Sequence, residues 1–322
     1  MSPDADHVPV LVDETLRYLL PERPDSGRGL FVDATVGLGG HAEALLEAAP
    51  GVRLLGIDRD PRALERAGRR LARFGDRVRL AEGAFSELAA LAERAGEPSA
   101  AGVYADLGVS SLQLDTAERG FSFRFDAPLD MRMGTRGPTA AEIVNSYPEA
   151  DLARIFREYG EERQARRIAR TLVEARRSEP VETTGDLRRL ILEAKGGRPG
   201  RPGRREGRVD PATRVFQALR IEVNRELDEL ERFLEEAVQL LELDGRLVVI
   251  SYHSLEDRIV KNTLRDLARG EVDEITGRPR AETRVIEVLT KKPITPSPQE
   301  VAANPRSRSA KLRAARRRSV EP

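Results

Sequence analysis

The first third of the chain alternates short apolar runs with segments of helical periodicity. An apolar run at 29–33 predicts a first strand, 52–58 predicts a second, buried strand, and 77–81 and 102–106 predict a third and a fourth strand. The segments 41–49, 61–73 and 85–94 predict helices. Asp60 and Pro61 fit the N-cap and first position of the second of these helices. Repeated strand–helix steps are typical of an α/β fold with a doubly wound parallel sheet.

The alternation stops near residue 113, where loops and helices at 149–159, 163–177 and 184–194 follow. A long amphipathic helix is predicted at 214–243, then a turn at Asp244–Gly245 and a buried strand at 246–251. The segment 284–289 alternates and predicts an antiparallel edge strand paired with 310–315. We therefore expect a first sheet segment at 1–112, a helical insertion at 113–213, and a second sheet segment at 214–322.

Composition narrows the class of protein. The 322 residues include no cysteine, which excludes disulfide scaffolds, thiol catalysis and iron–sulfur clusters. The histidines His7, His41 and His253 are far apart in sequence, so we expect no metal site. No apolar run approaches the ~20 residues that span a bilayer, and the start of the chain lacks a secretory signal. These features favour a metal-free cytoplasmic protein that does not enter a membrane.

The charged residues are segregated, although Lys+Arg and Asp+Glu number 54 each. The stretch 195–208 holds six basic residues and the single acid Glu206, and 306–318 holds seven basic residues and no acid. Both runs suit a polyanion such as a nucleic acid, while ordinary solvated surface is the alternative. The Gly/Pro/Arg stretch at 196–207 has almost nothing to bury and predicts a loop.

The strongest local motif is the glycine-rich stretch 33–41, between a predicted strand and a helix. Gly37 and Gly39 match the first two glycines of the dinucleotide fingerprint, and Ala42 occupies the third position. Asp58, at the end of the next strand, is placed to bind ribose hydroxyls. This arrangement fits NAD or S-adenosylmethionine, and a tight turn without a ligand is the alternative.

Other side chains with useful chemistry follow the remaining strands. Asp106 ends the fourth strand, beside the crevice where such folds bind ligands, and a capping role is its alternative. Phe85 follows the third strand and suits either an adenine ring or the core. Tyr252 and His253 follow the fifth strand, where an aromatic ring can stack on a base and an imidazole can contact base or phosphate. No G-x-S-x-G elbow is present, which argues against a hydrolase.

Eight ordered motifs, spread from His7 to about Arg316, resemble the RsmH/MraW family of small-subunit ribosomal RNA methyltransferases. They are 7–11, 33–41, 58–61, 106–111, 119–123, 128–133, 251–258 and 304–313. The resemblance implies a class I, Rossmann-like S-adenosylmethionine-dependent enzyme that methylates the N4 amine of a cytosine in the decoding region of 16S rRNA. It places the cofactor positions of the family on Gly39, Gly40, His41, Asp58, Phe85, Asp106 and Gln113, and Gly37 joins them from the glycine motif.

The candidate catalytic residues are Asp106, Tyr252 and His253, with Tyr252 as the aromatic that stacks on the target base. The expected partner is 16S rRNA, within the small ribosomal subunit or its assembly intermediate, gripped by the insertion and the basic C-terminal tail. The sequence leaves open whether the chain is a monomer or a homodimer. An NAD-dependent oxidoreductase and a non-catalytic RNA-binding assembly factor on the same scaffold are the alternative functions.

Overall fold

The computed structural model describes residues 9–20, 28–108, 116–196, 210–271, 273, 280 and 283–318. The chain forms two compact units, which we call the sheet unit (1–108 with 227–322) and the helical unit (109–226). His7, Gln113 and most of the 196–207 stretch lie outside the described residues. The helical unit is thus inserted between two halves of the sheet unit.

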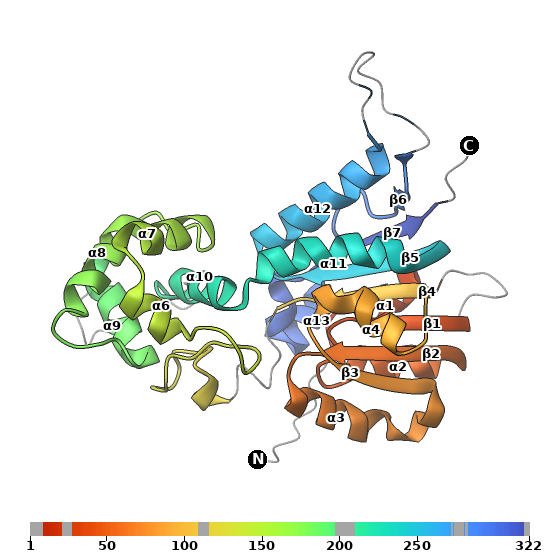
Figure 1. Cartoon of the computed structure of the whole chain (residues 1–322), viewed down its shortest axis with the longest axis horizontal. Helices are drawn as coiled ribbons and strands as arrows, with labels where there is room; N and C mark the ends of the chain where they lie inside the picture. The colour runs from red at the N-terminus through yellow and green to blue at the C-terminus, as the bar shows by residue number, and fades with distance from the viewer. Residues whose placement is uncertain are drawn as a thin grey trace. The chain divides into compact units, whose positions relative to one another are not determined.

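The sheet unit is built on seven strands in the order β3-β2-β1-β4-β5-β7-β6 (Figure 1). The first five strands in the chain are parallel, whereas β7 runs antiparallel to both β5 and β6. Their bounds are β1 Arg28–Asp33, β2 Gly51–Asp58, β3 Val78–Glu82, β4 Ala100–Asp106, β5 Leu241–Ser251, β6 Ile286–Val288 and β7 Lys311–Arg317. This confirms the predicted doubly wound sheet with an antiparallel edge.

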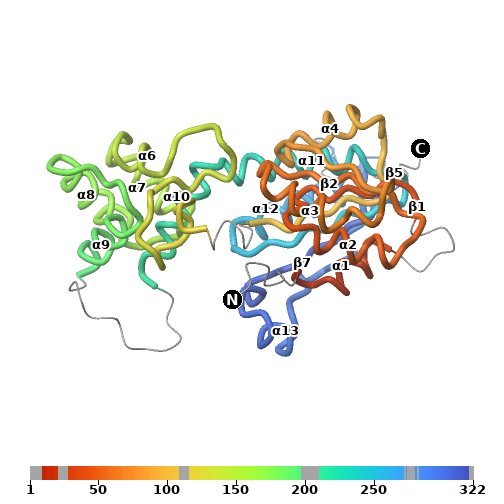
Figure 2. Tube along the Cα trace, turned by 90° about the horizontal axis from the view of Figure 1, so that it is seen from below, coloured from red at the N-terminus to blue at the C-terminus, as the bar shows by residue number. Residues whose placement is uncertain are grey.

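Alternate residues of a strand point to opposite faces of the sheet, and here both sets are apolar. Helices therefore cover both faces (Figure 2). Leu30 and Val32 of β1 pack in one hydrophobic cluster with α4 (Leu88–Arg94), α11 (Glu226–Leu240) and α12 (Ser254–Arg269). Phe31 packs in the other cluster with α1 (Val12–Leu19), α2 (Gly40–Ala48) and α3 (Pro61–Leu71). Short helices complete the unit at η1 Ala72–Arg77, η2 Phe85–Glu87, α13 Pro298–Ala303 and η5 Pro305–Ser309.

The helical unit has a hydrophobic core of its own. Its elements are η3 Ala117–Arg119, α6 Ala140–Ser146, α7 Glu149–Glu158, α8 Ala165–Ala175, α9 Thr184–Ala194 and α10 Thr213–Asn224. The three helices predicted in the insertion correspond to α7, α8 and α9. The predicted insertion boundary after residue 213 differs from the observed division, because Val215, Phe216 and Leu219 of α10 are buried in this core.

The prediction of one helix at 214–243 is wrong. The chain forms α10 and α11, separated at Arg225, which adopts a left-handed conformation (φ 51°) and ends α10. The predicted turn at Asp244–Gly245 lies instead inside β5, where Asp244 has φ 65° and the pairing register with β4 shifts between Ala100 and Gly102. The turn residues therefore form a bulge in the strand rather than its start.

The basic run near the C-terminus is largely part of the sheet, contrary to its interpretation as an RNA-gripping tail. β7 lies between β5 and β6, and Arg313 is buried beside the carboxylate of Asp257, with Nε 2.6 Å from Oδ1. Arg317 donates hydrogen bonds to the carbonyl oxygens of Val238, in the last turn of α11, and of Leu241, the first residue of β5. These cations complement internal acids and helix carbonyls, which explains a basic sequence in an interior strand.

Within the described ranges, no helix combines the length and the apolar composition needed to cross a bilayer.

Candidate functional site

Three carboxylates meet at the carboxyl edge of the parallel strands. Asp33 ends β1, Asp58 ends β2 and Asp106 ends β4. β1 lies between β2 and β4, with Asp33 paired to Gly56 on one side and to Tyr104 on the other. The carboxyl edge of a doubly wound sheet is where such folds bind ligands, so the sequence places its acids at the expected position.

The glycine turn after β1 is fixed by Asp58. Gly37 and Gly39 have φ of 51° and 79°, in the left-handed region that favours glycine. The carboxylate of Asp58 accepts hydrogen bonds from the backbone N–H groups of Gly37 and Asp60, both 2.9 Å away. Burial is the largest influence on this carboxyl group and raises its pKa. Gly39 then forms the N-cap of α2, which opens at Gly40.

The turn and Asp58 together fit a nucleoside cofactor. Two oxygens of a carboxylate offer about four acceptor positions, and the described backbone uses two of those of Asp58. A Cβ built on Gly37 would find no heavy atom nearer than 3.7 Å, so the backbone there is open to an approaching ligand. Asp58 can therefore accept hydrogen bonds from ribose hydroxyls while it holds the turn.

Asp106 is held at the edge by contacts from the β5–α12 connection and from the loop after β1. Its Oδ1 accepts a hydrogen bond of 2.9 Å from the hydroxyl of Tyr252, and its backbone N–H donates to Thr35 Oγ1 at 2.7 Å. Burial raises the pKa of Asp106 to about 7, with the charge of Glu256 acting in the same direction and the Tyr252 hydrogen bond opposing it. The side chain is still 18% exposed, so it can reach a ligand.

His41 lies against Asp106 but forms no hydrogen bond with it. Its Nε2 donates to the carbonyl oxygen of Val10 at 2.8 Å, which fixes the tautomer because a carbonyl can only accept. Burial lowers the pKa of His41, so the ring is neutral near pH 7. The unprotonated Nδ1 is 3.9 Å from Asp106 Oδ2. His41 thus borders the site as a neutral, buried ring.

Asp33 and Tyr104 form a buried pair that the sequence analysis did not single out. The Tyr104 hydroxyl donates to Asp33 Oδ2 at 2.6 Å, and Asp33 Oδ1 accepts from the N–H of Thr35 at 3.1 Å. Burial raises the pKa of Asp33 to about 7. A tyrosine within a buried strand requires a partner for its hydroxyl, which is the signal that could have revealed the pair. Through Thr35, this pair connects β1 with the backbone of Asp106.

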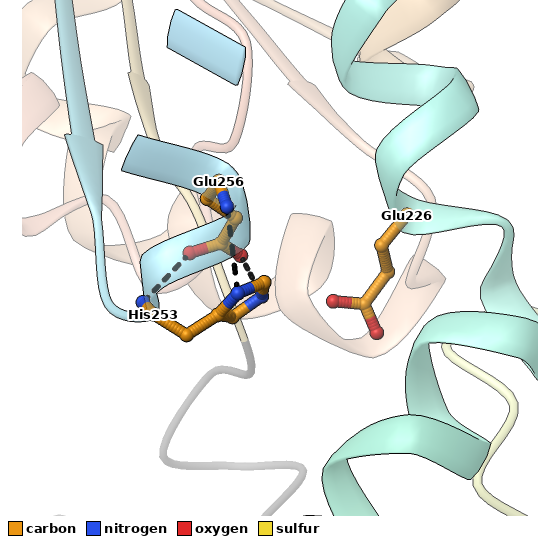
Figure 3. A group of neighbouring side chains, drawn as sticks. All are labelled: Glu226, His253 and Glu256. Carbon is orange, nitrogen blue, oxygen red and sulfur yellow. Dashed lines mark hydrogen bonds and ion pairs between the residues drawn. The ribbon is translucent and has the colours of Figure 1, made fainter. Parts of the chain in front are cut away.

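Tyr252 and His253 occupy the connection from β5 to α12. His253 is the N-cap of α12, and its Nδ1 accepts from the N–H of Glu256 at 3.4 Å. Glu256 Oε2 accepts from the N–H groups of Tyr252 and His253 at 2.8 and 3.2 Å, as Figure 3 shows for His253. These contacts hold Tyr252 next to Asp106, and they make His253 the residue that caps the N-terminus of α12. The predicted contact of His253 with base or phosphate stays a prediction.

Phe85 lies at the start of η2, and its ring makes an edge-to-face contact with Phe233 of α11, with centroids 5.4 Å apart. The side chain is half-buried against the core, so its predicted adenine contact would use the part of the ring left free. Gln113 cannot be placed, because it lies outside the described residues. The structure therefore brings together Gly37, Gly39, Asp58, Asp106, His41 and Tyr252.

The strand order, the glycine turn after β1 and the acid that ends β2 define a class I S-adenosylmethionine-dependent methyltransferase. The chain belongs to the MraW methylase family, which matches residues 4–318.

Two relatives are similar over nearly the whole chain. The Ribosomal RNA small subunit methyltransferase H of Thermobifida fusca (strain YX) is 49% identical over 318 residues, which cover 98% of this chain and 94% of the relative. The protein of the same name from Syntrophotalea carbinolica is 50% identical over 319 residues, covering 97% of this chain and 98% of the relative.

Proposed function

We propose that this chain transfers a methyl group from S-adenosylmethionine to the N4 amine of a cytosine in 16S rRNA, within the small ribosomal subunit or its assembly intermediate, in the bacterial cytoplasm. The observation that carries the proposal is the carboxylate of Asp106. It ends β4 beside the glycine turn, is held by Tyr252 and has a pKa near neutrality. The family and the names of its relatives support this class of substrate.

The cofactor, when bound, supplies an electrophilic methyl group. Asp58 would accept hydrogen bonds from its ribose hydroxyls, and the backbone of the turn at Gly37 and Gly39 allows a close approach. Phe85 would flank the adenine ring, and Gly40, His41 and Gln113 would complete the binding site according to the resemblance. Asp58 needs no rearrangement for this role, because two backbone N–H groups already orient it.

Asp106 would act on the target amine. An exocyclic amine of cytosine is a weak nucleophile, because its lone pair is delocalised into the ring. A carboxylate that accepts a hydrogen bond from the amine orients it and returns electron density to nitrogen. Methylation would leave the amine nitrogen with one proton too many, and Asp106 would accept that proton. A pKa of about 7 suits a proton acceptor at neutral pH.

Tyr252 would position Asp106. Its hydroxyl donates to Asp106 Oδ1, and its ring lies close to Gly108, where a Cβ would be 3.4 Å from Cδ2. The predicted stacking of Tyr252 on the target base is compatible with this hydrogen bond only through the exposed part of the half-buried ring. Because the amine must reach a carboxylate at the sheet edge, the target base would be unstacked or flipped.

The direct test is incubation of the full chain with labelled S-adenosylmethionine and small subunits that lack the modification, followed by mapping of the labelled nucleotide. We expect label on N4 of one cytosine, and Asp106→Asn to reduce transfer by about 10²- to 10⁴-fold. Cofactor binding without any transfer would favour the assembly factor, and binding of NADH instead of the labelled cofactor would favour the oxidoreductase. Sedimentation of the full chain distinguishes monomer from homodimer.

A further inference from the structure

The helix α8 belongs to the helical unit (Figure 1). Exposed arginines line one face of this helix and the turn before it. Arg163, Arg166 and Arg167 are exposed, and Arg170 continues the same face. The opposite face buries Ala165, Ile168, Ala169 and Leu172 in the core of the unit. The two faces follow the helical repeat, so the arginines form one continuous surface, which we call the α8 arginine face.

The arginines of this face have few acidic partners. Within the part of the chain that the structure describes, Arg163, Arg166 and Arg167 form no ion pair, and Arg170 Nε is 3.8 Å from Glu149 Oε1 with both side chains exposed. Some exposed arginines elsewhere in the unit are paired with acids. Arg157 is 3.2 Å from Glu158, and Arg189 is 3.4 Å from Asp186.

The placement of these cations does not stabilise the helix. Arg166 and Arg167 stand in the first turn of α8, which holds no acid, where the helix dipole disfavours positive charge. Arg166 and Arg170 also form a like-charge i,i+4 pair, which destabilises a helix. These arginines therefore do not serve the stability of α8. Binding of an external anionic partner would explain why they are there.

We infer that the α8 arginine face binds the phosphate backbone of the ribosomal RNA substrate, an inference that rests on the proposed function. A guanidinium matches phosphate oxygens with paired hydrogen bonds, and each phosphate neutralised releases counterions. At the rise of a helix, Arg163 and Arg170 are about 10 Å apart along the axis. This length matches about three phosphates of one strand of a duplex. The face carries no exposed aromatic or large aliphatic side chain, which distinguishes it from a membrane-binding helix.

The test compares two variants of the full chain that each remove two positive charges from exposed positions of the helical unit. R166Q/R167Q alters the α8 arginine face, and R157Q/R189Q alters two arginines that are paired with acids. Affinity for protein-free 16S rRNA is measured from about 50 to 300 mM salt, and methyl transfer to small subunits is measured under the same conditions.

We expect R166Q/R167Q to weaken RNA binding about tenfold at low salt and to reduce the slope of log K against log salt by about 1–2. The KM of R166Q/R167Q for small subunits should rise as its RNA affinity falls, while its kcat stays within about twofold of the wild type. R157Q/R189Q should match the wild type within about twofold in affinity, KM and kcat. Thermal unfolding should show R166Q/R167Q to be as stable as the wild type or slightly more so, because a repulsion is removed.

Equal affinities and salt slopes for R166Q/R167Q and the wild type would overturn the inference. A loss seen with intact small subunits but not with protein-free rRNA would also overturn it, because the partner would then be an acidic protein surface. The proposed function fails in a different way, since the wild type would then transfer no methyl group whatever its RNA affinity.

Discussion

Asp106 combines a buried environment with a neighbouring hydroxyl, so its protonation state sets its chemistry. Burial raises its pKa from the ordinary 3.8 to about 7, and only the ionised form can accept a proton. We therefore predict that kcat/KM of the wild type rises with pH through about pH 7 and levels off above pH 8. The Asp106→Asn variant should not show this rise of kcat/KM with pH, which pH-rate profiles would measure. A wild-type rate that is flat from pH 6 to 8 contradicts the role.

Tyr252 affects the pKa of the Asp106 carboxyl group. Its hydrogen bond lowers the pKa of Asp106, in opposition to burial. Tyr252→Phe removes that donor and keeps the ring, so the pKa of Asp106 should rise and the limb of the pH profile should move to higher pH. We expect a loss of about 10-fold or more at pH 7 that narrows at pH 9. An equal loss at both pH values would indicate that the hydroxyl does not act through Asp106.

Asp33 links burial to the stability of the fold. Because its pKa is raised from 3.8 to about 7, the folded chain keeps this proton up to about pH 7, whereas the unfolded chain loses it near pH 4. The contribution of Asp33 to stability is thus present at low pH and falls, by about 1.4 kcal/mol per pH unit, as pH rises towards 7. Asp33→Asn removes this titration. The free energy of unfolding of the variant minus that of the wild type should therefore increase from pH 5 to pH 7. Urea unfolding at several pH values measures this, and parallel pH dependences would disprove it.

At the scale of elements, α6 shows how a short helix is specified by its first turn. Thr139 Oγ1 accepts from the N–H of Glu142 at 3.1 Å, and Glu142 Oε2 accepts from the N–H of Thr139 at 2.8 Å, which makes a capping box. Thr139→Ala should cost about 1 kcal/mol of unfolding free energy, whereas Thr139→Ser should cost much less. Chemical denaturation of the two variants provides the measurement. Equal losses would assign the effect to packing of the threonine methyl group.

Most of the parallel strands could be predicted because β1, β2, β4 and β5 contain buried apolar runs, and three of these end in an aspartate. Asp33, Asp58 and Asp106 are visible in this way, and parallel pairing brings them to one edge. The break at Arg225 could not be predicted, because neither glycine nor proline interrupts the amphipathic pattern on either side of it. The partnership of Asp106 with Tyr252 joins residues 146 apart in sequence, so only the tertiary fold reveals it.

At the scale of the whole molecule, the net charge of zero conceals two different uses of arginine. In β7, Arg313 and Arg317 satisfy acids and carbonyls inside the sheet unit, whereas on α8 the arginines face solvent. Local sequence does not separate these uses, because both segments are rich in basic residues. The distinction depends on which positions the topology buries.

The interior position of β7 leads to a prediction about the intact chain. A chain that ends at Ala310 would lose the strand between β5 and β6 and leave the edge of β5 unpaired. We expect this variant to aggregate or to lose its cooperative unfolding transition, because an exposed hydrophobic edge invites association. A chain that ends at Arg318 keeps β7 and should unfold as the full chain does, as circular dichroism and sedimentation can show. If the shorter chain stays folded and loses only RNA affinity, the basic segment is a tail after all.

The inserted helical unit also affects the order of events during biosynthesis. The first four strands leave the ribosome before the insertion, but β4 finds its partner β5 only after the whole helical unit has been made. At ordinary translation speeds the edge of β4 waits on the order of ten seconds. Nascent chains paused within the insertion should therefore depend on chaperones that shield an unfinished sheet, while the helical unit, whose sequence is continuous, can collapse around its own core in the meantime.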